Sequence, residues 1–266
     1  VNNLYPTSAW APGQIVAVYR AIGRQATVGR TLDGVVRLCA LRQAVHVDLV
    51  AGLPAATWRD LRDDLRRIVS LAPGTIQVEL LKALPGTRLR REAASWDLIH
   101  APDPPYEVLQ TATMTHAELQ QARRLGQAVD WFYNALPLQS VTQRASGAIA
   151  DFWDLLLPFV GARVAPGTGP GLEQRFRVLD DFLAGHPAEH RHRLHYAWLR
   201  HGLSARQGIA AAAPWKDRLP TGAALVEGDP AVVPSRFVRA ALGAEYIFAY
   251  ATGEGAGRQA CAVYRL

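Results

Sequence analysis

The residue best suited to chemistry is Asp48, because it is a carboxylate in largely apolar surroundings. It lies within residues 45–50, a short apolar run of the kind that forms a buried parallel strand. An ionised carboxylate in such a strand is costly unless it is paired or hydrogen-bonded. We therefore expect Asp48 either to contact a ligand or to form a structural salt bridge with Arg42 or another neighbour.

Two residues with special backbone properties follow the predicted strand that contains Asp48. Gly52 allows close approach of another group, and Pro54 fixes the turn after the strand. They could shape a ligand pocket or simply end the strand. Gly86 and Thr87 form a similar pair, for which a tight turn is the preferred interpretation.

A cluster of histidines lies near residue 190. Its members are His186, His190, His192, His195 and His201. Two pairs have helical spacing that would suit a metal, but Pro187 interrupts the first and nearby arginines would repel a cation. We expect a polar helix face and no metal site. No Ser-His-Asp order, phosphate-binding loop or paired carboxylates stand out, so we assign no catalytic residue.

Composition narrows the class of protein. The net charge of +6 comes almost entirely from arginines spread along the 266 residues, so nucleic acid is not an expected partner. No apolar stretch reaches the about 20 residues that span a bilayer, and no secretory signal is evident, which predicts a cytoplasmic protein without a membrane segment. Cys39 and Cys261 lack C-x-x-C spacing and are expected to be small buried hydrophobes.

The elements around Asp48 form a β-α-β unit. A strand over residues 45–50 is followed by an amphipathic helix that begins after Thr57, where Asp60 completes a capping box. A second strand is expected over residues 75–82, and an amphipathic helix from Val28 to Cys39 precedes the unit, itself preceded by a shorter helical segment over residues 15–22.

The remainder of the chain divides into two further parts. After a proline-rich linker at residues 101–105, the apolar periodicity is helical, and a Gly/Pro loop interrupts it at 161–171. The expected helices cover residues 115–133, 141–160, 172–184 and 189–202. Two β-rich runs at 245–251 and 259–266 then predict a hairpin. We expect domains at 1–100, 101–220 and 221–266.

Several segments resemble radical S-adenosylmethionine (SAM) enzymes. Residues 47–54 with Thr57 resemble the strand and turn written D-L-I-x-G-L-P-G-E-T in that family, and residues 21–24 resemble the helix before it. Further segments resemble a subgroup that joins a cobalamin-binding domain to the radical core and ends in a helical domain of unknown function. These segments are residues 79–87, 104–109, 131–134 and 194–199.

The resemblance implies a fold and cofactors. The fold class would be α/β plus all-α: the last two strands and helices of a partial (β/α)6 barrel, a helical domain and a short C-terminal β-hairpin. The full-length family uses SAM, a [4Fe-4S] cluster and cobalamin. By resemblance, Arg24 would lie near the SAM carboxylate and Asp48 near its ribose, with Gly52 and Pro54 at the ligand end of the strand.

The resemblance also implies that this sequence lacks part of the enzyme found in the family. The sequence contains no C-x-x-x-C-x-x-C motif to hold the cluster. We therefore expect a fragment or truncated form of a cobalamin-dependent radical SAM enzyme, inactive alone, whose partners are its missing N-terminal half and an unidentified substrate. The alternative is a non-enzymatic helical protein-interaction module derived from that family.

Overall fold

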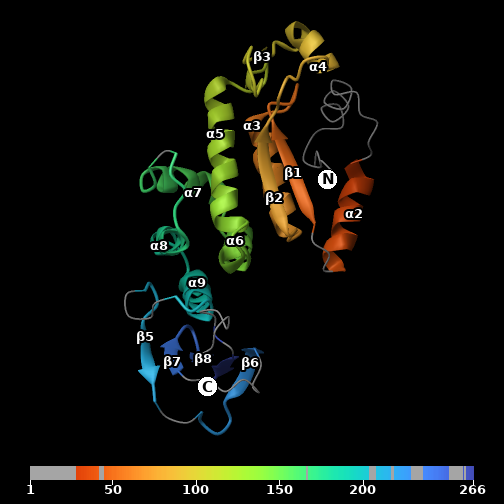
Figure 1. Cartoon of the computed structure of the whole chain (residues 1–266). Helices are drawn as coiled ribbons and strands as arrows, with labels where there is room; N and C mark the ends of the chain where they lie inside the picture. The colour runs from red at the N-terminus through yellow and green to blue at the C-terminus, as the bar shows by residue number, and fades with distance from the viewer. Residues whose placement is uncertain are drawn as a thin grey trace. The chain divides into compact units, whose positions relative to one another are not determined.

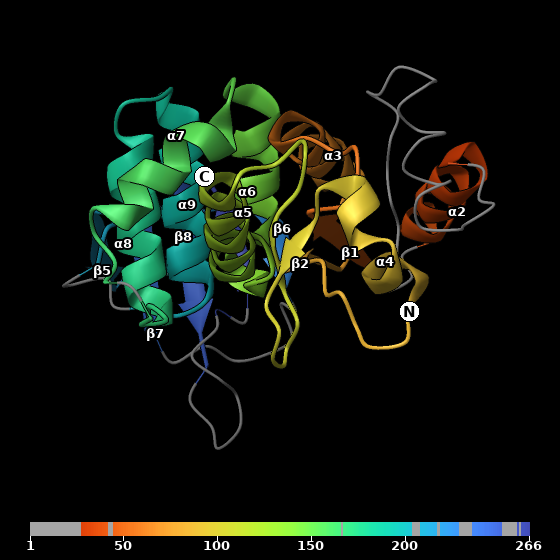
Figure 2. The same ribbon diagram turned by 90° about the horizontal axis from the view of Figure 1, so that it is seen from above.

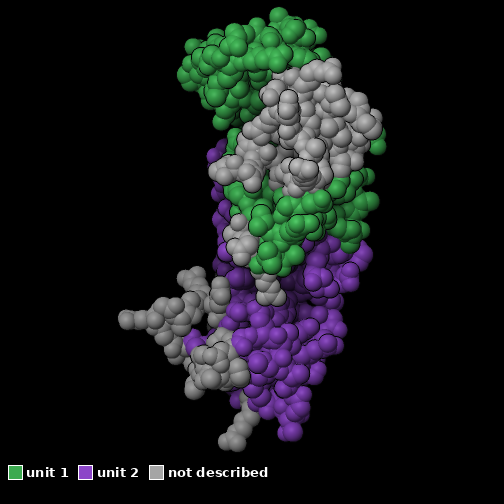
Figure 3. All heavy atoms as spheres, turned by 90° about the vertical axis from the view of Figure 1, so that its right-hand side faces the viewer, with its two compact units in different colours: residues 1–134, 146–158 green, residues 135–145, 159–266 purple. Residues whose placement is uncertain are grey.

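The computed structural model describes most of the chain. The described residues are 28–41, 45–165, 167–203, 208–216, 219–228, 236–251, 260 and 262–266. The chain divides into two compact units, coloured separately in Figure 3. Unit 1 comprises Val1–Asn134 and Ser146–Pro158, and unit 2 comprises Ala135–Ala145 and Phe159–Leu266. The described residues are of mixed α/β class, and the three-part division expected from the sequence stays a prediction.

Unit 1 contains the predicted β-α-β unit (Figure 1). Its elements are β1 (His46–Ala51), α3 (Trp58–Ser70) and β2 (Thr75–Leu80). The two strands are parallel, from His46 opposite Thr75 to Ala51 opposite Leu80. The expected capping box is present: Asp60 N donates to Thr57 Oγ1 at 3.2 Å, and Thr57 N donates to Asp60 Oδ2 at 2.8 Å. Helix α2 (Val28–Ala40) is also where its periodicity predicts it.

Helix α5 (His116–Ala128) packs against β2, and Figures 1 and 2 show it beside the strand pair. It continues as a short π-helix over Val129–Tyr133. The hydroxyl of Tyr133 donates to the carbonyl oxygen of Pro73 at 2.7 Å. Asn134 accepts from Ile76 N at 3.0 Å and donates to Ile76 O at 2.7 Å. The end of this helix is thus hydrogen-bonded to the chain at the start of β2.

The remaining elements of the first half are short. They are α4 (Arg88–Arg91), a 3-10 helix (Ala93–Trp96), β3 (Ile99–His100) and β4 (Val108–Gln110). Strands β3 and β4 pair antiparallel.

One segment that was predicted to be a single helix forms two helices. The segment expected to be a single helix over residues 141–160 forms α6 (Leu136–Ala148) and α7 (Phe152–Gly161). Between them Asp151 has a φ of 53°, a left-handed conformation that ends a helix and that Asp tolerates better than most residues. Asp151 also accepts a hydrogen bond from Arg66 of α3 at 3.2 Å, and Asp154 pairs with Arg62. Ion pairs to α3 accompany the break.

Unit 2 contains α8 (Leu172–Leu183), α9 (Ala188–Arg200) and a five-stranded sheet. The rings of Phe176 and Trp198 join the two helices edge to face, with centroids 5.4 Å apart. The strands are β5 (Ala212–Trp215), β6 (Ala224–Gly228), β7 (Arg236–Ala241), β8 (Glu245–Tyr250) and β9 (Ala262–Arg265).

The predicted C-terminal hairpin is present as part of a larger sheet. Strands β8 and β9 do pair antiparallel, with Ile247 opposite Tyr264. They lie inside a larger antiparallel sheet with the order β5-β7-β8-β9-β6. Strand β5 pairs with β7 from Ala212 opposite Ala240 to Trp215 opposite Phe237, so the sheet begins before residue 221.

In the described part of the chain, every helix is too short or too polar to cross a bilayer.

Candidate functional site

The parallel strand pair has one apolar face and one polar face. Val47, Leu49 and Ala51 of β1 are buried, as are Ile76 and Leu80 of β2. The alternate residues form the other face. They are His46, Asp48 and Val50 on β1, opposite Thr75, Gln77 and Glu79 on β2. Because side chains alternate across a strand, the chain places its polar groups on one side of this sheet and its core on the other.

Asp48 lies at the centre of the polar face. Its side chain is 15% exposed, and Nε2 of His46 lies 2.7 Å from its Oδ1. This contact is an ion pair when the imidazole is protonated. Oδ1 receives no aligned hydrogen bond from a described residue, so the contact with His46 is electrostatic. Arg42, the salt-bridge partner suggested by the sequence, lies outside the described residues.

Gly52 and Pro54 lie in a different environment from Asp48. Both are buried, and Gly52 has a φ of 86°. A Cβ atom on Gly52 would lie 3.2 Å from Cδ2 of Leu119 and 3.5 Å from Cγ1 of Val108. Gly52 therefore ends β1 against apolar side chains, while Asp48 lies on the polar face. Arg24 and the helix expected over residues 15–22 lie outside the described residues.

The histidine cluster is held by ion pairs and burial. Asp180 of α8 accepts two hydrogen bonds from Arg191, from Nε and from NH2, each 2.8 Å long. Its Oδ1 also lies 2.7 Å from Nε2 of His195. Burial alone would raise the pKa of Asp180, but the hydrogen bonds from Arg191 and His195 outweigh it and lower that pKa to about 2. His190 is buried.

Among the described residues, no group of three or more His, Cys, Asp or Glu side chains is arranged to hold a metal ion. The arrangement of Asp180, Arg191 and His195 instead joins α8 to α9.

The sequence interpretation missed the neighbours of Asp48. His46, Gln77 and Glu79 share its face, and Gln77 donates a hydrogen bond to Glu79 at 2.6 Å. The signal was present: polar residues at 46 and 48 alternate with apolar residues at 47 and 49. Interpreting residues 45–50 as a fully buried strand leaves this alternation of polar and apolar residues unused.

Unit 1 contains a second buried carboxyl, on α3. Asp64 is 6% exposed, and its Oδ1 has no hydrogen-bond partner in the described part of the chain. Burial raises its pKa to about 8, helped by the negative charges of Asp60 and Asp63. This carboxyl is therefore largely protonated at neutral pH.

Part of the chain matches a known protein family. A search of curated proteins finds none that this chain resembles. Residues 94–204, which include α5 to α9, match the family described as "Protein of unknown function (DUF4080)", a domain associated with cobalamin and radical SAM proteins.

Proposed function

We propose that this chain is the C-terminal part of a cobalamin-dependent radical SAM enzyme, in which β1 and β2 are the last two strands of a partial (β/α)6 barrel. The observation that carries the proposal is the division of the strand pair into a polar face with Asp48 and an apolar face. An apolar face suits the outer side of a barrel strand, which helices cover, and the ligands of such barrels bind at the C-terminal ends of the strands. The match of residues 94–204 adds support.

The free edge of β1 is consistent with this proposal. Among the described residues, β1 pairs only with β2, so the backbone groups on its other edge have no strand partner. A two-stranded sheet with an open edge is marginally stable and prone to pair with another strand. A preceding barrel strand would complete this sheet.

The chain has a residue that suits the ribose of SAM, but it lacks the cysteines that would hold the iron-sulfur cluster. Three thiolates are needed for the C-x-x-x-C-x-x-C site, and the sequence has only Cys39 and Cys261. We therefore derive no step through a [4Fe-4S] cluster here, and we assign no residue to cobalamin. Asp48 has the chemistry to accept hydrogen bonds from two ribose hydroxyl groups.

In this proposal Asp48 binds and orients SAM, which supplies the reactive chemistry when bound. The ionised carboxylate would hold the ribose through charge-assisted hydrogen bonds, and the adjacent His46 positions the carboxylate. Gly52 and Pro54 act by ending β1 at the ligand side of the barrel.

The test uses this chain alone and this chain co-expressed with the protein region encoded directly upstream. Both samples are reconstituted anaerobically with iron and sulfide, and 5′-deoxyadenosine is measured after addition of SAM and a reductant. The proposal expects product from the pair and none from the chain alone. Cluster absorbance and product from the chain alone, or an upstream region without the cysteine motif, would overturn it.

A matched pair of variants tests the role of Asp48. Asp48→Asn is expected to raise the KM for SAM in the assembled enzyme by about tenfold or more, because a charge-assisted hydrogen bond is lost. Glu79→Gln removes one negative charge from the same face and should leave that KM unchanged. Equal effects of the two substitutions would assign Asp48 a general electrostatic role and remove it from the SAM site.

A further inference from the structure

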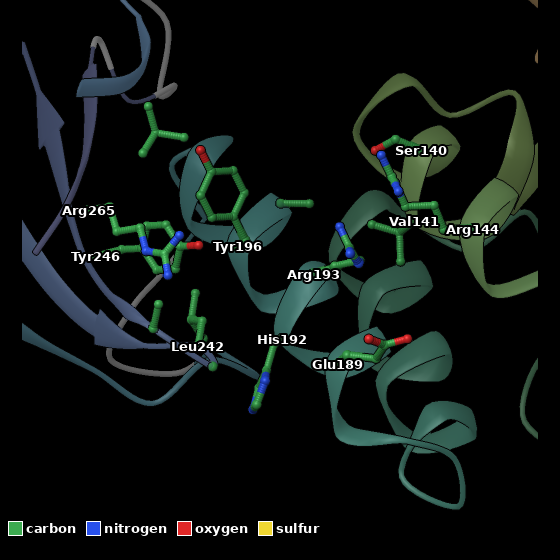
Figure 4. A pocket seen from close by; sticks show the side chains of 14 residues that line it. Ser140, Val141, Arg144, Glu189, His192, Arg193, Tyr196, Leu242, Tyr246 and Arg265 are labelled. Carbon is green, nitrogen blue, oxygen red and sulfur yellow. The ribbon is translucent and has the colours of Figure 1, made fainter. Parts of the chain in front are cut away.

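A pocket in unit 2 is lined by side chains from both helices and strands. It has a volume of about 590 Å³, within the range of about 300–1,000 Å³ that is typical of sites for small organic molecules. Its walls come from α6, α9, the turn between β7 and β8, and strands β6, β8 and β9 (Figure 4). All of these residues belong to unit 2, so the pocket does not depend on the barrel strands.

The charge of the lining is strongly positive. Arg144 of α6, Arg193 of α9 and Arg265 of β9 all line the pocket, together with His192. Among the described lining residues, Glu189 is the only carboxylate. Three guanidinium groups on three different elements therefore face one hollow with a single opposing charge.

These arginines differ from their neighbours on α9. Arg191 pairs with Asp180, and Arg200 pairs with Glu227. Within the part of the chain that the structure describes, the side chains of Arg144, Arg193 and Arg265 have no ion-pair or hydrogen-bond partner. Guanidinium groups present planar sets of donors that match phosphate and carboxylate oxygens, so these three are available to an anion.

Two tyrosines also line the pocket, and Tyr246 lies beside Arg265 on the neighbouring strand (Figure 4). The rings of Tyr196 and Tyr246 meet edge to face with centroids 5.4 Å apart. The hydroxyl of Tyr196 donates to Glu227 at 3.1 Å, which fixes that ring. Leu242 and Val141 add apolar surface. The two rings and these apolar side chains suit a flat, uncharged portion of a ligand.

The walls of the pocket are held in place. A Cβ atom on Gly243 would lie 3.0 Å from Nδ1 of His192, and Gly243 has a φ of 75°. The turn between β7 and β8 thus approaches α9 closely at a position that favours glycine. On the same helix, Tyr196 also contacts the ring of Phe248 with centroids 5.2 Å apart.

We propose that this pocket binds an organic phosphate of about nucleotide size. The phosphate oxygens contact Arg144, Arg193 and Arg265, and a ring system lies against the two tyrosines. A phosphate monoester carries about −2 charge at neutral pH, which balances the excess of arginine over carboxylate in the lining. This binding site is separate from the proposed SAM site and stands without it.

The experiment is calorimetric titration of the full 266-residue chain with ADP, inorganic pyrophosphate and adenosine. ADP is expected to bind more tightly than pyrophosphate, and adenosine is expected to bind far more weakly than both. Arg193→Gln and Arg265→Gln should each weaken ADP binding by about tenfold to a hundredfold, since each removes a charge-assisted contact.

Arg124→Gln is the matched control. This exposed arginine lies on α5 outside the pocket, so its substitution removes the same charge and should leave ADP binding unchanged. Circular dichroism of each variant verifies the fold. Failure of both phosphates to bind at millimolar concentration, adenosine binding as tight as ADP, or equal loss with Arg124→Gln would overturn the proposal. Pyrophosphate binding as tight as ADP would overturn the role of the tyrosines.

Discussion

A Cβ atom on Gly126 would lie 2.7 Å from the carbonyl oxygen of Val78, so α5 approaches β2 more closely than any residue with a side chain allows. Val78 pairs with Leu49, which is the residue after Asp48 in β1. The close contact therefore fixes the strand that lies beside the candidate SAM-binding residue.

Gly126→Ala tests this contact. The added methyl group must push α5 away from β2, and we expect the free energy of unfolding to fall by about 1–3 kcal/mol. Urea unfolding followed by circular dichroism measures the loss. Gly147→Ala in α6 is the control, because no atom lies within 4 Å of its added Cβ and alanine favours a helix. A similar loss in both variants would contradict the account.

Asn134→Ala tests the hydrogen bonds at the start of β2. This substitution leaves Ile76 N and Ile76 O without their side-chain partner, and we expect a loss of about 1–3 kcal/mol in unfolding free energy. Asp130→Ala is the control, because it removes only the other partner of the Asn134 amide, at 2.7 Å. If both substitutions lower the unfolding free energy by the same amount, the hydrogen bonds to Ile76 make no measurable contribution to stability.

Asp180→Asn tests the network between α8 and α9. The pKa of Asp180 is lowered from 3.8 to about 2 in the folded protein, so its ionised form stabilises the fold above about pH 4 and this contribution is lost as pH falls through about 2. We expect the variant to lose about 2–4 kcal/mol at neutral pH, and the difference from the native protein to shrink in acid. Urea unfolding across this pH range measures both.

The adjacent residue provides the control for that prediction. Asp181 is 64% exposed and lies 3.8 Å from Arg163, so Asp181→Asn should change the stability by less than about 1 kcal/mol. A difference between native protein and Asp180→Asn that stays constant with pH would rule out the proposed ionic contribution.

The sequence predicts the β-α-β elements of unit 1 well, because their signals are local. The capping box at Thr57 and the amphipathic pattern after it fix the start of α3, and the apolar runs on each side fix β1 and β2. Asp48 stands out as a carboxylate in an apolar strand. Its contact with His46 follows from the two-residue period of a strand and could also have been predicted.

Other features depend on contacts that are distant in sequence. The break at Asp151 falls within an apolar pattern that remains helical, and its ion pairs are with α3. Strand β5 contains Pro214 and is a strand because it pairs with β7. The pocket arginines lie at positions 144, 193 and 265, and only the folded chain brings them together.

Asp64→Asn tests the buried carboxyl of α3. The pKa of Asp64 is raised from 3.8 to about 8, so the folded protein keeps this proton while the unfolded chain releases it. The carboxyl therefore disfavours folding increasingly as pH rises from about 4 to about 8. Asparagine is a neutral group of the same size, and we expect a gain of about 5 kcal/mol at pH about 8 and almost none at pH about 4.

The control for Asp64→Asn is Asp63→Asn on the same helix. Asp63 faces Arg59 and Arg66 in surface ion pairs, so its substitution should lower stability slightly at neutral pH. Urea unfolding of the native protein and both variants at several pH values distinguishes the two carboxyls. A gain for Asp64→Asn that does not grow with pH would show that this group is already charged in the folded protein, and its burial would then need a cation from outside the described residues.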